Sequence, residues 1–371
     1  MRVQWRRISI IAAICIIILG FVLWHFRSNE SKPIVLGAIV PMTGAVATFG
    51  KWAEAGLTMA IEDINRSGGV ERRKLELVVE DSAADPSKAV SGLRKLVDID
   101  HAEAIFSIVS AVDLALIPII EREPVVLISH ATHPAITKDR KHVLRHSPTV
   151  QEETEVITNS LTTEDVSEGV AILYLNDDYG AAVVNEIKLK ILQKFPGTRI
   201  NVVSYERDES LFTAQVSRAI ADKPRLVIVA GLGKSSGLPI RRLREVAFRG
   251  KIIATLGFIV TDGPVAAGAA AEGVWAVDLQ PPTEVGTSSL QQRYKDRTGE
   301  SKLPMTVVFF YNSVQLWASA RSAVGANDPD KIVSYVKGIG SFSGTGEVIK
   351  IDPNGDMLPP VRLIQYRRSG Q

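Results

Sequence analysis

Apolar and polar positions along this chain follow two patterns that alternate with each other. Short apolar runs typical of buried strands are followed by longer stretches in which apolar residues recur at helical spacing. The first run, Ile34 to Val40, is followed by a helical pattern from Lys51 to Asn65 that stops at Gly68-Gly69. Repetition of this unit predicts strands joined by crossover helices on a parallel sheet.

Two series of such units follow one another along the chain. The first series continues with predicted elements at residues 74–80, 86–99, 104–109, 114–121 and 125–129. A second series starts near Val150, with elements at 170–175, 180–195, 200–205, 212–221, 226–230, 238–248, 251–256 and 274–279. The rest is predicted to form helices at 287–298 and 307–324 and two late strands at 347–351 and 361–366. A chain of 371 residues exceeds what one hydrophobic core supports, so two lobes are expected.

The N-terminus has the pattern of an export segment. Arg2, Arg6 and Arg7 precede an uncharged apolar run from Ile8 to Phe26, which as a helix would be roughly 28 Å long, close to the ~30 Å hydrocarbon core. Basic residues before an apolar run place everything after Arg27 across the membrane. An uncleaved transmembrane anchor is favoured because no small-residue cleavage site ends the run. A cleaved signal peptide is the alternative, because the run is only slightly longer than a signal-peptide core.

Charge and cysteine content exclude several classes of protein. Lys plus Arg number 43 against 41 Asp plus Glu, and no basic face is evident after the N-terminus, so no nucleic-acid partner is expected. The only cysteine, Cys15, lies in the apolar N-terminal run, which rules out an intrachain disulfide or a cysteine metal cluster.

Loops at the carboxyl ends of parallel strands are where open α/β sheets bind ligands. Four such loops carry candidate chemistry: residues 41–50, 110–113, 129–134 and 176–180. Ser110 ends a strand and opens a helix, so its hydroxyl and the following N–H groups form a potential anion site, although a plain N-cap serine has the same appearance. Thr132 and Tyr179 have the same two interpretations, ligand contact or local structure.

No catalytic constellation is evident. The segment Gly231 to Gly237 follows a strand as a dinucleotide-binding loop would, but its glycine spacing differs from that motif and no acidic residue follows at the expected distance. His130 and His133 are three residues apart, as in many zinc pairs, without further nearby ligands. Neither a metal, a cofactor nor an enzymatic activity is expected, and an NAD-dependent enzyme is the least favoured alternative.

The segments around these loops resemble the type I periplasmic binding proteins of the leucine/isoleucine/valine-binding family, which serve ABC importers. The resemblance covers nearly everything after Ser31. The stretches that carry it are residues 37–44 with 49–50, 60–69 (Ala-Ile-Glu-Asp-Ile-Asn-Arg-Ser-Gly-Gly), 80–81 with 85–86, 173–180 and 344–355.

The resemblance implies two doubly wound parallel-sheet lobes joined by three hinge segments, near Val150, Leu279 and Ser341. The domains expected on this basis are an N-terminal basic end and anchor (1–27), a linker (28–33), a first lobe (34–149 and 280–340) and a second lobe (150–279 and 341–371). A ligand would bind between the lobes, and hinge closure would present the closed form to a permease.

The resemblance also implies ligand-binding positions. They comprise Phe49 as an aromatic lining residue, Ser110 with Ala111 and Thr132 at the ligand carboxylate, the His130 and Ala131 backbone beside them, Tyr179 from the second lobe, and Leu232 and Leu256. Family members that bind amino acids place an acid at the position of Leu256 to pair with the ligand ammonium. Its absence favours an apolar cavity for a carboxylate or amide without an α-ammonium, unless Asp113, Asp262 or Asp278 supplies the missing acid.

The function expected on this basis is extracytoplasmic binding of a small amino acid or a related carboxylate or amide for an ABC importer. The expected partners are the small-molecule ligand, the permease subunits and, through the N-terminal helix, the membrane. A membrane-anchored ligand sensor for a signalling partner is the alternative.

Overall fold

The computed structural model describes residues 32–281 and 284–367. The predicted anchor at residues 8–26 lies outside them, so anchoring stays a prediction. Within the described part of the chain, no helix combines the length and the apolar character that a membrane span requires.

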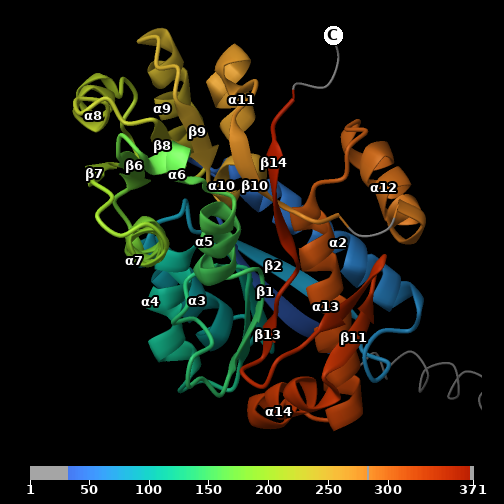
Figure 1. Cartoon of the computed structure of the whole chain (residues 1–371). Coiled ribbons are helices and arrows are strands. Elements are labelled where there is room, and N and C mark those ends of the chain that lie inside the picture. The colour runs from blue at the N-terminus through green and yellow to red at the C-terminus, as the bar shows by residue number, and fades with distance from the viewer. Residues whose placement is uncertain (1–31, 282–283, 368–371) are drawn as a thin grey trace, which may run out of the picture.

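The first sheet has the strand order β13-β5-β4-β3-β1-β2, and all its neighbours pair in parallel. Its strands are β1 (Ile34–Val40), β2 (Leu75–Asp81), β3 (Ala104–Ser107), β4 (Val126–Ser129), β5 (Val143–His146) and β13 (Asp356–Met357). The associated helices are α2 (Ala47–Arg66), α3 (Pro86–Asp98), α4 (Ser110–Ile120), α12 (Glu284–Thr298), α13 (Met305–Val324) and α14 (Pro329–Ile339). The sheet and the helices α3, α4, α13 and α14 occupy the lower part of Figure 1, whereas α12 lies at the upper right.

The second sheet has the order β14-β10-β9-β8-β6-β7, parallel except for the antiparallel pair β10–β14. Its strands are β6 (Val170–Leu175), β7 (Ile200–Tyr205), β8 (Leu226–Ala230), β9 (Lys251–Ala254), β10 (Trp275–Leu279) and β14 (Val361–Gln365). The associated helices are α5 (Val150–Asn159), α6 (Thr163–Val166), α7 (Asp178–Lys194), α8 (Thr213–Ala219), α9 (Lys234–Glu245), α10 (Leu256–Ile259), α11 (Gly263–Ala267) and the 3₁₀ turn η1 (Gly268–Ala271).

The central strand β8 shows why these strands appear as uninterrupted apolar runs in the sequence. Every residue of β8 is buried, and successive side chains point to opposite faces of the sheet. Leu226, Ile228 and Ala230 join the apolar cluster on one face, whereas Val227 and Val229 join the cluster on the other. Helices cover both faces, as the predicted doubly wound arrangement requires.

One part of the predicted lobe assignment is wrong. Residues 341–371 were expected to lie in the second lobe, but β13 pairs with β5 of the first sheet, and only β14 joins the second sheet. The hairpin of β11 (Ser341–Gly344) and β12 (Glu347–Lys350) forms a separate sheet that contacts α13, where Thr345 N–H donates to Asn312 Oδ1 at 2.8 Å. The chain therefore passes from the first sheet to the second at residues 358–360 rather than near Ser341.

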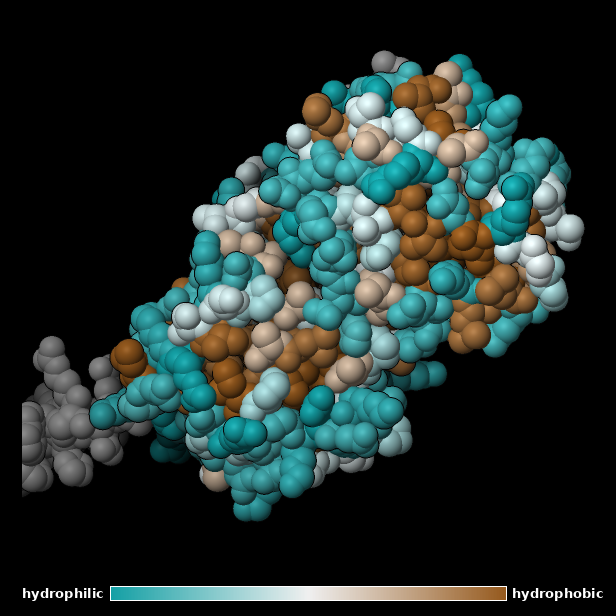
Figure 2. Space-filling model, turned by 90° about the vertical axis from the view of Figure 1, so that its left-hand side faces the viewer, coloured by the Kyte–Doolittle hydropathy of each residue, from teal (hydrophilic) through white to brown (hydrophobic). Residues whose placement is uncertain are grey.

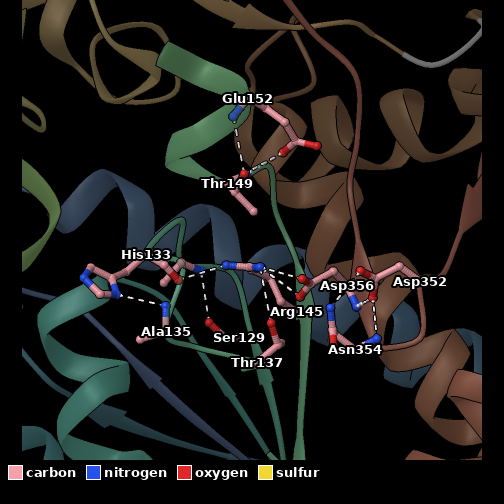
Figure 3. A network of polar contacts seen from close by, with 11 residues as sticks. Ser129, His133, Ala135, Thr137, Arg145, Thr149, Glu152, Asp352, Asn354 and Asp356 are labelled. Carbon is pink, nitrogen blue, oxygen red and sulfur yellow. Dashed lines mark hydrogen bonds and ion pairs between the residues drawn. The ribbon is translucent and has the colours of Figure 1, made fainter. Parts of the chain in front are cut away.

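A buried ion pair explains why β13 stays with the first sheet (Figure 3). Arg145 donates from Nε to Asp356 Oδ1 at 3.0 Å and from Nη2 to Asp356 Oδ2 at 2.6 Å. The guanidinium also donates to the His133 carbonyl and the Thr137 hydroxyl, and Asp352 accepts the Asp356 N–H. Such a buried pair needs these additional hydrogen bonds to offset its desolvation. It joins the end of β5 to β13, and each of these strands leads into a segment that passes to the second sheet.

The face shown in Figure 2 carries two main apolar areas, separated by hydrophilic residues. Isolated apolar residues on a surface are ordinary. These areas alone therefore do not mark a ligand site.

Candidate functional site

A cavity lies where the carboxyl ends of the strands of both sheets meet, and contains about 610 Å³ of empty space, including the part open to solvent. Every predicted ligand-binding residue except Ala111 lines it. The complete lining is Phe49, Ile108, Val109, Ser110, His130, Ala131, Thr132, Ser147, Pro148, Glu153, Tyr179, Leu232, Leu256, Gly257, Val260, Leu279, Thr306, Phe309 and Phe310. Four segments that are distant in sequence, three of them at helix starts, thus converge on one mostly apolar space.

The first turn of α4 presents hydrogen-bond donors at this cavity. The first helical bond runs from Asp113 N–H to the Val109 carbonyl at 3.0 Å, so the N–H groups of residues 110–112 precede the helical ladder. The helix has no side-chain cap, and Ser110 is buried, with 3% of the residue exposed. A carboxylate placed here would receive the hydroxyl, free N–H groups and the positive end of the helix dipole. This geometry supports the anion-binding role rather than a plain N-cap.

Backbone strain occurs directly before this turn. Val109 has φ 89° and ψ 116°, outside the regions that β-branched residues favour. Such a conformation costs of order 1–3 kcal/mol and persists only where the surrounding structure imposes it. The strained residue connects β3 to α4 and itself lines the cavity, so the strain lies where the donors are positioned.

Asp113 does not line the cavity. It is fully buried in the first turn of α4 and accepts a hydrogen bond from the Ser129 hydroxyl, and burial raises its pKa to about 7. Asp262 and Asp278 are also absent from the lining, and Asp278 forms an ion pair with Arg362. None of the three aspartates considered from the sequence therefore supplies an acid to the ligand.

The two histidines suspected of binding metal have separate partners. The His130 ring stacks on Phe310 with centroids 3.7 Å apart, and its Nε2 lies 3.1 Å from the Ser313 hydroxyl, which is also 3.1 Å from His146 Nδ1. Burial lowers the pKa of His130 to about 3 and that of His146 to about 4, so both rings are neutral at physiological pH. His133 Nδ1 instead accepts the Ala135 N–H, and no cluster suited to a metal occurs among the described side chains.

Glu153 is the functional candidate that the sequence analysis missed. It lines the cavity, its residue is 0% exposed, and its Oε2 accepts hydrogen bonds from the Tyr179 hydroxyl at 3.0 Å and from Leu256 N–H at 3.2 Å. Its other oxygen, Oε1, is buried and has no partner. Burial raises the pKa of this carboxyl to about 7.

The expectation of a cavity without an acid is therefore wrong. It followed from the apolar side chain at Leu256, but the Leu256 N–H holds a carboxylate that belongs to another element. The sequence contains a signal for this residue: Val150, Glu153 and Ile157 follow helical spacing on the buried face of α5. An acidic residue on the inward face of a helix needs a partner or a function.

Comparison with known proteins agrees with this architecture. Residues 33–371 match the model of a family described as "Periplasmic binding protein". The chain belongs to this family. A relative named Leu/Ile/Val-binding protein homolog 2 from Brucella abortus (strain 2308) is 26% identical over 346 residues, which cover 90% of this chain and 91% of that protein.

Two solved structures show the same fold. The leucine binding protein from Thermotoga maritima has a TM-score of 0.80 at 22% identity, covering 91% of this chain and 96% of that chain. A solute binding protein of an ABC transporter from Rhodopseudomonas palustris BisB5, in complex with 3,4-dihydroxybenzoic acid, has a TM-score of 0.77 at 22% identity, covering 91% and 93%. The predicted resemblance and fold class of the two sheets are confirmed.

As a periplasmic binding protein, this chain is an extracytoplasmic solute-binding protein rather than an enzyme.

The glycine-rich segment from Gly231 to Gly237 has a packing role. A Cβ on Gly231 would lie 2.3 Å from the Tyr205 hydroxyl, and one on Gly237 would lie 2.2 Å from the Gly263 carbonyl oxygen. Between them, Leu232 lines the cavity. The glycines therefore allow close packing around α9 and need no nucleotide to explain them.

Proposed function

We propose that this protein binds a small carboxylate-containing solute in the cavity and delivers it to an ABC-type permease. The ligand carboxylate lies at the first turn of α4, against Ser110 and the neighbouring N–H groups, while residues of the second sheet close over the rest of it. The observation that carries the proposal is the convergence of Ser110, Thr132 and Tyr179 on one cavity from different elements.

The side chains available at the Ser110 end support an anionic ligand group. A carboxylate leaving water needs donors, and a hydroxyl at a helix start beside unused N–H groups supplies them. Thr132 adds a second hydroxyl, and neither side chain has a hydrogen bond to another described residue. The apolar remainder of the cavity, including Phe49 and Phe309, suits an aliphatic or aromatic body.

A thermal-shift screen of amino acids, amides, and aliphatic and aromatic carboxylates tests this proposal. A ligand present at one hundred times its Kd stabilises the folded state by ~2.7 kcal/mol. We expect at least one carboxylate to raise the unfolding temperature and Ser110→Ala to weaken its binding about 10–100-fold, because a hydrogen bond to a charged group is lost.

Ser91→Ala is the matched control, since Ser91 lies on the exposed side of α3 and bonds only within its helix. It should leave the affinity unchanged. The proposal fails if no carboxylate stabilises the protein, or if Ser110→Ala and Ser91→Ala bind the ligand equally well.

A further inference from the structure

We propose that Glu153 accepts the amino group of the ligand, so that the solute carries an ammonium as well as a carboxylate. This inference rests on the proposed carboxylate-binding function and specifies the ligand further. It reverses the expectation, drawn from Leu256, of a ligand without an α-ammonium.

The position of the Glu153 carboxylate is fixed by two donors. Tyr179 from α7 and the backbone of Leu256 at the start of α10 both donate to Oε2, which leaves Oε1 without a partner. A buried acceptor without a donor is costly, and each such group in a native structure calls for an explanation. Because Glu153 lines the cavity, a donor on the ligand satisfies Oε1.

The charge of the closed cavity favours an ammonium as that donor. The described lining residues include no Lys or Arg, and the rings of His130 and His146 are neutral. A bound carboxylate beside an ionised Glu153 would leave two buried negative charges without a compensating cation. An ammonium between them neutralises one charge and donates to Oε1, whereas a ligand hydroxyl supplies only the hydrogen bond.

Glu153 also lies where the resemblance to the binding-protein family predicted an acid. That acid was expected on the residue at position 256, and here the N–H of Leu256 contacts Glu153 Oε2 at 3.2 Å. The same region of the cavity therefore contains a carboxylate that comes from α5 rather than from the loop after β9.

Calorimetric titration with matched ligand pairs tests the role of Glu153. The probes are leucine with 4-methylpentanoate and phenylalanine with 3-phenylpropanoate, each pair differing only by the amino group. In the full-length protein, the amino acid of the pair that fits should bind about 100-fold more tightly than its deaminated analogue. Glu153→Gln should weaken the amino acid by a similar factor and change the affinity of the analogue less than threefold.

Glu152→Gln is the matched control. Glu152 neighbours Glu153 but serves the capping box of α5 with Thr149, a role that glutamine also fills, and it does not line the cavity. This variant should bind both members of each pair as the unmodified protein does. The discrimination by the unmodified protein is a second readout that does not depend on how Glu153→Gln folds.

The outcomes separate this inference from the proposed function. If the deaminated acids bind as tightly as the amino acids, and Glu153→Gln is without effect, the inference is wrong while the carboxylate-binding function stands. If neither these probes nor any carboxylate of the thermal-shift panel binds, the proposed function fails as well.

Discussion

At the scale of single residues, two buried carboxyl groups lack a cationic partner, one in the cavity and one in the first turn of α4. Glu153 lines the cavity, Asp113 belongs to the first turn of α4, and burial raises the pKa of each to about 7. Both groups therefore change charge near neutral pH, unlike the two buried histidines. Ionised Glu153 attracts the ammonium of an amino-acid ligand, whereas ionised Asp113 repels its carboxylate.

Glu153 should make amino-acid binding stronger as the pH rises. Burial raises the pKa of its carboxyl to about 7. An ammonium favours the ionised form, so below pH 7 binding has to displace a proton. Each pH unit below 7 then lowers the affinity by up to tenfold. Ionised Asp113 opposes this trend, because it repels a carboxylate near Ser110.

The comparison with Glu153→Gln isolates this contribution. Between pH 5.5 and 7 the slope of log affinity against pH should fall by nearly one on substitution, measured by titration with the amino acid that binds. Ionisable groups on the elements packed against α5 are common to both proteins. They are Asp177 at the N-cap of α7, Asp178, Tyr179, Lys190 and Lys194 on α7, and the Asp278–Arg362 pair of β10 and β14. Equal slopes in the two proteins would exclude Glu153 as the titrating group.

At the scale of elements, α2 and α13 pack unusually closely. A Cβ on Gly56 of α2 would lie 2.4 Å from the backbone carbonyl oxygen of Val307 on α13. Phe309 and Phe310, which follow on α13, line the cavity. The separation of these two helices therefore helps to set the position of one cavity wall.

Gly56→Ala should lower the free energy of unfolding by about 1–3 kcal/mol, because the backbones must move apart. Chemical denaturation followed by circular dichroism measures this change. Gly338→Ala is the control: Gly338 lies in α14 with no atom within 4 Å of its added Cβ. There alanine should stabilise by roughly 0.5–1 kcal/mol through helix propensity. Similar effects of the two substitutions on the free energy of unfolding would show that α2 and α13 can accommodate a Cβ at position 56.

The sequence predicted the long elements well and the short polar ones poorly. The predicted bounds of β1, β6 and β8 agree with the structure because these strands are continuous apolar runs. The predicted bounds of β7 agree as well, although this strand contains Asn201 and Ser204. Strand β5 was missed, since two of its four residues are Arg145 and His146. Both are buried only because Asp356 and Ser313 provide hydrogen bonds from distant parts of the sequence.

The candidate site, like the fold, could be predicted from the sequence only in part. Loops at the carboxyl ends of strands can be located from periodicity, so the sequence predicts that residues such as Ser110, Thr132 and Tyr179 lie together. Glu153 projects from the inward face of a helix, and its proximity to Leu256 depends on how α5 and α10 pack. A pattern along the chain does not contain that distance.

At the scale of the whole molecule, two sheets of similar strand order face one cavity. The Arg145–Asp356 pair joins the two strands, β5 and β13, from which the chain leaves the first sheet for the second (Figure 3). Closure around a ligand would turn the sheets toward each other about such connections while each sheet keeps its own core. A ligand that contacts Ser110 in one half and Glu153 in the other stabilises the closed form.

The most direct test of this account is a crystal structure of the protein grown with the tightest ligand found in the thermal-shift screen. We predict one ligand molecule in the cavity, with its carboxylate against the Ser110 hydroxyl and the N–H groups at the start of α4. We also predict its amino group within hydrogen-bond distance of Glu153. A ligand bound elsewhere on the protein, or one whose carboxylate lies away from Ser110, would contradict the central claim.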